Sequence, residues 1–207
     1  MSGVAERQTL MTPERFGSGL TYAAYRAQMK QNRERFEKFE RENVLSDADV
    51  EPFRTLRQPL RTAVLTEDWC SDAVATLPLL AALAERSGKL DVRIFFRDQN
   101  LDLMDAHLKE GKFRSIPTFI FYDPDWNEIG TWLEKPVVIA DLRARLRLEI
   151  YASDPAFGSP EVLSSELPDA DRERLWAAIT RMRDDTTAES NREVLRELRL
   201  LLLESDR

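Results

Sequence analysis

Short apolar runs and amphipathic stretches alternate in the middle of the chain. Residues 62–66 and 92–96 are largely apolar and predict two buried strands. Leucines recur at helical spacing between them, and this helix is expected to end at Ser87 and Gly88. Strand–helix–strand connections are right-handed and make the strands parallel, so we expect these strands to be parallel neighbours. A short helix is predicted over 101–108.

Two further strands and a helix complete this pattern. Residues 118–122 and 129–133 flank a stretch rich in Asp, Pro and Asn, which is typical of a hairpin turn. Pro136 is then expected to begin a helix with one apolar stripe. The predicted order is therefore β-α-β-α-β-β-α, an α/β fold built on a four-stranded mixed sheet.

The chain on either side of this pattern is predicted to be helical. Apolar residues at helical spacing over 22–43 predict one long amphipathic helix, and Ser46 can cap a shorter one. The C-terminal residues predict a helical hairpin whose apolar stripe covers the core, packs within the hairpin or forms a dimer. We expect an N-terminal helical extension over 1–60, a core over 61–151 and a C-terminal helical hairpin over 152–207.

Composition and charge narrow the class of protein. The 207 residues are 43% apolar, enough for one or two domains, and 30 basic against 37 acidic residues leave a net charge of −7. Basic and acidic residues are interspersed, so we expect no nucleic-acid partner. No apolar run approaches the roughly 20 residues of a membrane helix, and residues 1–8 do not resemble a secretory signal. We therefore expect no membrane partner and a cytoplasmic location.

The chain has one cysteine, Cys70, and one histidine. These counts exclude an intrachain disulfide and a zinc site made of several Cys and His residues, so we expect no metal. Cys70 lies where the first strand meets its helix, and unpaired N–H groups at a helix start favour a thiolate. The neighbouring acids Glu67, Asp68 and Asp72 oppose this effect, so we expect partial cancellation.

The pattern resembles the thioredoxin superfamily at four places. Trp69-Cys70-Ser71-Asp72-Ala73 stands where thioredoxins have Trp-Cys-x-x-Cys, and Pro78 stands where their helix is kinked. Ile116-Pro117-Thr118 matches the cis-proline loop, and residues 119–133 match the closing hairpin. A single-cysteine branch with a Trp-Cys-x-Asp-Ala motif is more similar still, over about residues 20–150. The resemblance implies a thioredoxin-like fold.

The resemblance also implies a site around Cys70. It implies a cis bond at Pro117 beside the thiol, which leaves the backbone of Ile116 free to pair with an extended substrate. Trp69 either shields the thiol or contacts the substrate. Arg114, which directly precedes this loop, either pairs with an acidic group such as a glutathione carboxylate or is a solvated surface residue.

Two residues depart from the dithiol thioredoxins. Ala73 replaces the second cysteine, so no disulfide can form within the motif. Val64 replaces the buried acid of the central strand, which leaves Asp72 and Asp68 as the nearest candidates for proton transfer. Asp72 is therefore either a catalytic proton carrier or a helix cap.

Three functions are compatible with this site. In the first, Cys70 is the nucleophile of a monothiol oxidoreductase that acts on protein or glutathione mixed disulfides. An external thiol such as glutathione then resolves the adduct as co-substrate, and no other cofactor is expected. The second is a redox-inactive, protein-binding module with a thioredoxin fold. The third is a peroxide sensor, in which Cys70 forms a sulfenic acid. The oligomeric state does not follow from the sequence.

Overall fold

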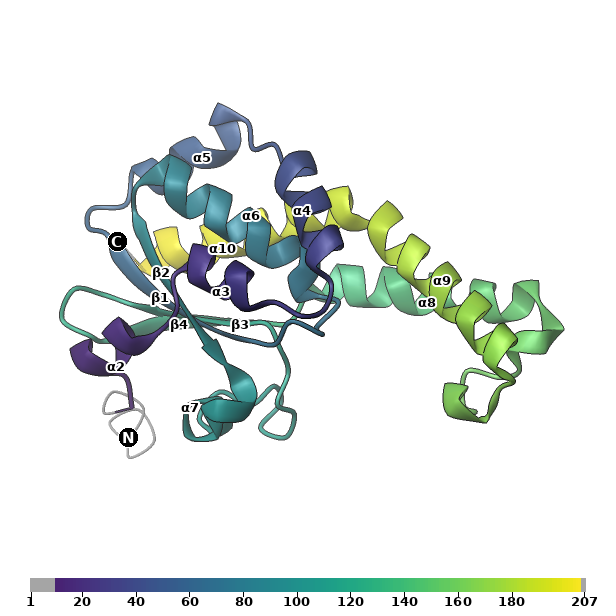
Figure 1. Cartoon of the computed structure of the whole chain (residues 1–207). Helices are drawn as coiled ribbons and strands as arrows, with labels where there is room; N and C mark the ends of the chain where they lie inside the picture. Colours follow the sequence, from purple (N-terminus) through teal and green to yellow (C-terminus); the bar gives the residue numbers. More distant parts are fainter. Residues whose placement is uncertain (1–9, 206–207) are drawn as a thin grey trace. The chain divides into compact units, whose positions relative to one another are not determined.

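Figure 1 shows the computed structural model of the chain, which describes residues 10–205. The expectation that residues 1–8 hold no secretory signal lies outside the described residues. The chain divides into two compact units: the first runs to Glu134 and resumes at Val194, and the second is Lys135–Glu193. The division into an extension, a core and a hairpin stays a prediction.

The first unit is built on a four-stranded sheet with the order β2-β1-β3-β4. β1 and β2 are parallel and in register from Leu60 opposite Leu90 to Thr66 opposite Phe96. β3 pairs antiparallel with both β1 and β4. The predicted mixed sheet is therefore confirmed. The strands are β1 (Leu60–Thr66), β2 (Leu90–Phe96), β3 (Thr118–Tyr122) and β4 (Glu128–Leu133).

Helices connect the strands as the apolar pattern predicts. α6 (Ala73–Ser87) follows β1 and ends at Gly88, whose positive φ of 64° is readily adopted by glycine. η1 (Arg97–Gln99) and α7 (Leu101–Asp105) follow β2. Figure 1 shows α6 and α7 on opposite sides of the sheet.

From residue 10 onward, four helices precede the sheet, and they differ from the prediction at one point. The helix expected over 22–43 is wrong as a single element, because the chain leaves helical geometry between α3 and α4. The backbone N–H groups of Lys30 and Gln31 donate to Asp68 Oδ2 at 2.7 and 3.2 Å, and Asn32 has a positive φ of 55°. These N–H groups are hydrogen-bonded to the Asp68 carboxylate instead of to carbonyl groups within a helix. The helices are α2 (Pro13–Ser18), α3 (Tyr22–Gln28), α4 (Arg33–Glu42) and α5 (Asp47–Arg54).

The second unit is helical and contains a small core. α8 (Val137–Ser153) and α9 (Asp169–Asp185) pack against each other, with η2 (Pro155–Phe157) and η3 (Ser164–Glu166) between them. An open groove of about 460 Å³ lies between α8 and α9. The buried apolar cluster of this unit consists of Tyr151, Phe157, Leu175 and Ile179.

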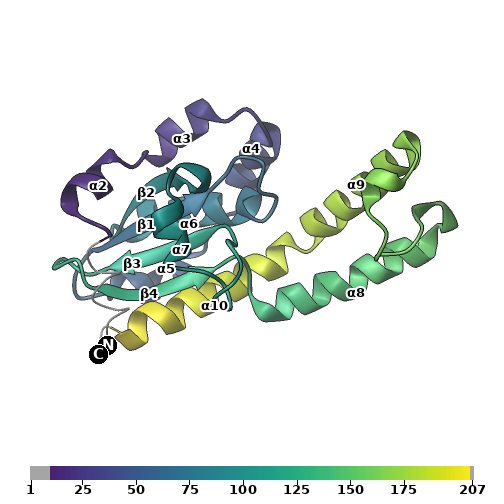
Figure 2. The same cartoon turned by 90° about the horizontal axis from the view of Figure 1, so that it is seen from below.

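The last helix, α10 (Thr187–Ser205), begins in the second unit, and its C-terminal part belongs to the first. That part packs on the sheet, where a Cβ added to Gly130 would stand only 2.5 Å from Leu201 Cδ1. Trp132 Nε1 donates to Glu197 Oε2 at 2.8 Å, and Figure 2 shows α10 beside β4. The apolar stripe of α10 therefore covers the core, as one of the expected arrangements. Its buried members are Val194, Leu198 and Leu202.

No helix within residues 10–205 combines the length and apolar character that crossing a membrane requires.

Candidate functional site

The loop between β1 and α6 carries Cys70. The structure begins α6 at Ala73, with Asp72 as its N-cap, so Cys70 precedes the first helical turn in which we expected it. The Cys70 N–H donates to the Glu67 carbonyl at 3.1 Å, which closes the loop. The residue is 6% exposed. The backbone of this loop, rather than the first turn of α6, therefore holds the cysteine.

The expected neighbours of Cys70 lie beside it. The Ile116–Pro117 peptide bond is cis, and the Cys70 thiol donates to the Ile116 carbonyl at 3.3 Å. Ile116 and Pro117 are both buried. A hydrogen bond in which the thiol is the donor favours the neutral thiol over the thiolate. The structure therefore brings Cys70, Ile116 and Pro117 together.

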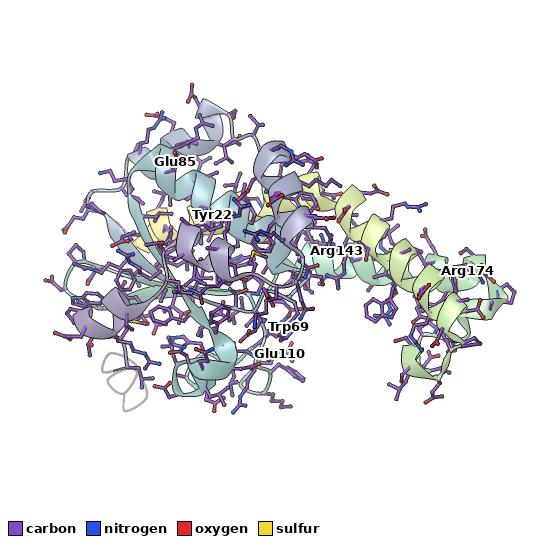
Figure 3. All side chains as sticks on the ribbon, viewed as in Figure 1. Tyr22, Trp69, Glu85, Glu110, Arg143 and Arg174 are labelled. Atoms are coloured by element: carbon purple, nitrogen blue, oxygen red, sulfur yellow. The ribbon has the colours of Figure 1, made fainter. Side chains whose placement is uncertain are left out.

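Trp69 marks the outer side of the site. Its side chain is 44% exposed, and it is labelled in Figure 3. The guanidinium carbon of Arg97 lies 5.0 Å from the centre of the Trp69 ring, in cation–π contact. Arg97 also donates to the Arg114 carbonyl at 3.4 Å, so one side chain connects Trp69 with the segment before the cis-proline loop.

Arg97 is a site residue that the sequence analysis missed. β1 and β2 are parallel and in register to their last residues, so the residues that follow them emerge side by side. The parallel pairing of these two strands was the signal that could have placed Arg97 beside the Cys70 loop. Arg114, in contrast, directs its guanidinium to Asp105, with Nε and Nη2 at 2.6 and 2.7 Å from the carboxylate oxygens. This pair lies at the surface and lowers the pKa of Asp105.

The acids that flank Cys70 have separate structural partners. Glu67 is 9% exposed, and its carboxylate accepts the Asp98 N–H at 2.9 Å. Burial raises the pKa of Glu67 above its ordinary value, although the Asp98 N–H opposes the rise. Asp68 accepts the N–H groups of Lys30 and Gln31. Glu67 and Asp68 thus anchor the loop to η1 and to the segment between α3 and α4.

Asp72 occupies the N-cap position of α6 without the hydrogen bond that such a residue usually makes. Its side chain accepts no capping N–H, and the Thr76 hydroxyl donates instead to the Asp72 carbonyl at 2.8 Å. The side chain is half-buried. A role for Asp72 in proton transfer stays a prediction.

The site offers one sulfur and no evident metal centre. Within residues 10–205 no three His, Cys, Asp or Glu side chains are grouped to hold a metal ion. The chain has no second cysteine, so any disulfide at Cys70 must join it to another molecule.

Solved structures share this fold. A Pseudomonas aeruginosa protein described as being of unknown function aligns with a TM-score of 0.58 and 17% identity, over 84% of this chain and 99% of its own. An HIV epitope-scaffold aligns with a TM-score of 0.54 and 18% identity, over 84% of this chain and 94% of its own. At these identities the likeness concerns the fold alone. A search of curated proteins finds no match.

A family model described as thioredoxin, Thioredoxin_9, matches residues 19–147. The match includes the N-terminal helices from α3 onward, the whole sheet, Cys70 and the cis-proline loop. The expected α/β thioredoxin-like fold is confirmed, while the narrower single-cysteine branch stays a prediction. With more than half of its residues matched, the chain belongs to the Thioredoxin_9 family of thioredoxin-like proteins.

Proposed function

We propose that this protein is a monothiol oxidoreductase that acts through Cys70 on mixed disulfides of proteins with glutathione. The contact between the Cys70 thiol and the Ile116 carbonyl at 3.3 Å carries this proposal, because it sets the only sulfur of a cysteine beside the backbone of a cis-proline loop. The cytoplasm, which keeps thiols reduced and supplies glutathione, is the proposed compartment.

The reaction consists of two exchanges. The Cys70 thiolate attacks the glutathione sulfur of the mixed disulfide, and the substrate protein leaves as a thiolate that takes a proton from water. Glutathione, as a thiolate, then attacks the Cys70 adduct, which releases oxidised glutathione and restores Cys70. The net reaction converts one mixed disulfide and one glutathione thiol into one protein thiol and one glutathione disulfide.

The residues around the thiol have proposed roles in binding. The backbone of Ile116, next to Pro117, pairs with an extended substrate, and Trp69 contacts it through its exposed ring. Arg114 binds an acidic group of the substrate only if its ion pair with Asp105 first breaks. Arg97 carries its positive charge against the Trp69 ring and is a further candidate for that carboxylate. Asp72 is the proposed carrier of the proton that the leaving thiolate takes from water.

A redox-inactive binding module is the second candidate function. It is favoured by the burial of Cys70 and by its bond to Ile116, both of which favour an unreactive thiol. In that case the same loop and Trp69 would hold a partner protein, and Cys70 would contribute only to packing.

Turnover of a glutathionylated peptide separates these functions. The assay supplies glutathione and follows oxidised glutathione through glutathione reductase and NADPH, with the wild type and Cys70→Ser compared at equal concentration. We expect turnover that Cys70→Ser abolishes. Equal rates in both proteins would contradict the proposal and favour the binding module. Reduction of insulin by a thioredoxin-reductase system should be absent, because that reaction needs a second thiol in the motif.

A further inference from the structure

The groove between α8 and α9 is an open face of the second unit. Its volume is about 460 Å³. The residues that line it recur at the same helical spacing, i, i+3 and i+4, on both helices. They include Leu146, Glu149 and Ile150 on α8, and Ala178, Arg181 and Met182 on α9. Each helix therefore presents two apolar positions and one charged position to the groove, with an acid on α8 and a base on α9.

A hairpin of two helices leaves apolar surface uncovered. Ile150 and Met182 pack against the buried cluster of this unit, but both remain partly exposed in the groove. Helices bury such a face against further helices, as in antiparallel four-helix bundles. A second helical hairpin laid on the groove would complete a bundle of this kind.

Side-chain contacts near both ends of the hairpin fix how α8 and α9 are aligned. Arg143 Nε donates to Thr186 Oγ1 at 3.0 Å, and Arg174 Nη1 donates to Asp154 Oδ2 at 2.7 Å. The start of α8 therefore lies beside the end of α9, and the end of α8 beside the first half of α9. Figure 2 shows the two helices side by side.

This alignment places the acid and the base of the groove at nearly one height. Glu149 and Arg181 differ by about two residues along the helix axes, a rise of about 3 Å. Both residues are exposed, and neither side chain has an ion pair or hydrogen bond with another residue of the described part of the chain. Leu146 and Met182 are level in the same way. The two walls are therefore matched in height and opposite in charge.

We propose that a second copy of this chain occupies the groove, so that two α8–α9 hairpins form an antiparallel four-helix bundle. A two-fold axis along the bundle keeps each residue at its height and lays α8 of one copy on α9 of the other. Glu149 of each copy then lies beside Arg181 of the other, and Leu146 beside Met182. The groove carries charges of both signs, so it complements its own copy rather than a strongly acidic or basic partner.

The size of this face sets the strength of the dimer. α8 and α9 have 17 residues each, so the face is about 25 Å long and about two helix diameters, or 20 Å, wide. Two such faces bury on the order of 1,000 Å² in total, the lower end for specific interfaces. We therefore expect a reversible dimer that forms in the micromolar range. The inference goes beyond the proposed function, because no step of the exchange reaction requires it.

Sedimentation equilibrium of the full chain tests the proposal, with a reducing agent present to exclude dimers joined through Cys70. Glu149→Arg and Arg181→Glu each place like charges together at two points of the symmetric dimer. We expect each variant to weaken dimerisation at least about tenfold relative to the wild type. A wild type that stays monomeric up to several hundred micromolar, or a dimer that neither variant weakens, would overturn the proposal.

An equimolar mixture of the two variants is the sharpest comparison. In the mixed dimer each reversed charge again faces its opposite, so we expect the mixture to regain wild-type affinity, which also shows that both variants fold. Glu173→Arg is the matched control, because Glu173 is an exposed acid of α9 that does not line the groove. It should leave dimerisation unchanged. If the mixture stays monomeric, or if the control weakens dimerisation as much as Glu149→Arg does, the proposal is wrong.

Discussion

The two compact units bury apolar surface to very different extents. The core of the first unit takes residues from α2 through α7, from all four strands and from the end of α10. The second unit has only the cluster around Tyr151 and Leu175, beside an open groove. Polar contacts supplement this small core, for example those of Arg174 with Asp154 and Asp171, both at 2.7 Å.

This difference bears on the candidate site around Cys70, which lies in the first unit. Exposed ion pairs contribute roughly 0–1 kcal/mol each, whereas a fully buried aliphatic side chain contributes several times as much. The contacts described for the Cys70 loop all come from the first unit: Ile116, the Asp98 N–H and the backbone of Lys30 and Gln31. The dense core therefore fixes the site, and the second unit depends on few apolar residues.

Truncation of the first core should produce the largest effect. Leu77 in α6 and Leu198 in α10 are both 0% exposed. We expect Leu77→Ala and Leu198→Ala each to lower the free energy of unfolding by about 3–4 kcal/mol, through lost burial and the cavity left behind. Urea denaturation followed by tryptophan fluorescence measures this. A cost below about 1 kcal/mol for Leu198→Ala would contradict the packing of α10 on the sheet.

The same truncation in the second unit should act locally. Leu175 is also 0% exposed, but the cluster that surrounds it is small. We expect Leu175→Ala to cost about 2–3 kcal/mol and to remove amide hydrogen-exchange protection within residues 135–193. Exchange in β1 and β3 should stay as in the wild type. Loss of protection throughout the sheet would mean that the two units unfold as one.

Removal of the buried charge of Glu67 should stabilise the first unit. Its raised pKa means that the folded state disfavours the ionised form, so stability is greatest below the ordinary pKa of Glu and falls as pH rises through the folded value. Glu67→Gln keeps an acceptor for the Asp98 N–H and loses the charge. We expect a higher Tm than the wild type at pH 7 and equal values in acid. A lower Tm at pH 7 would contradict this account.

Substitution of Asp154, in the second unit, should have the smallest effect on stability. Its pH dependence should have the opposite sign to that of Glu67. The Ala156 N–H and, after it, Arg174 lower the pKa of this half-buried carboxyl, so its contribution exists above the ordinary pKa of Asp and is lost in acid. We expect Asp154→Asn to weaken exchange protection of the second unit slightly at pH 7 and to match the wild type in acid. If Asp154→Asn weakened exchange protection more than Leu175→Ala does, charge would stabilise the second unit more than burial does, and this account would be wrong.

Local patterns predicted the elements and the centre of the site. The strands, the end of α6 at Gly88 and the pairing of Cys70 with the Pro117 loop all depend on short motifs or on the resemblance they carry. These features are fixed by nearby residues, such as glycine at a positive φ. They were therefore accessible without a structure.

Features that depend on distant residues were not predicted. The break between α3 and α4 has its cause in Asp68, which lies far along the chain from Lys30. Arg97 reaches Trp69 only because β1 and β2 end in register. Apolar periodicity marks a stripe on a helix but does not name the surface that the stripe will cover, which is why the position of α10 remained open.

The contact between Gly130 and Leu201 has a consequence for synthesis of the protein. The surface of β4 around Gly130 is covered by a segment that begins at Val194, so the whole of residues 135–193 must leave the ribosome first. Until then the strand exposes an apolar face that invites association with other chains. Synthesis of the second unit thus delays the covering of β4 after the strands have left the ribosome. Chaperones can bind the exposed strand during that delay.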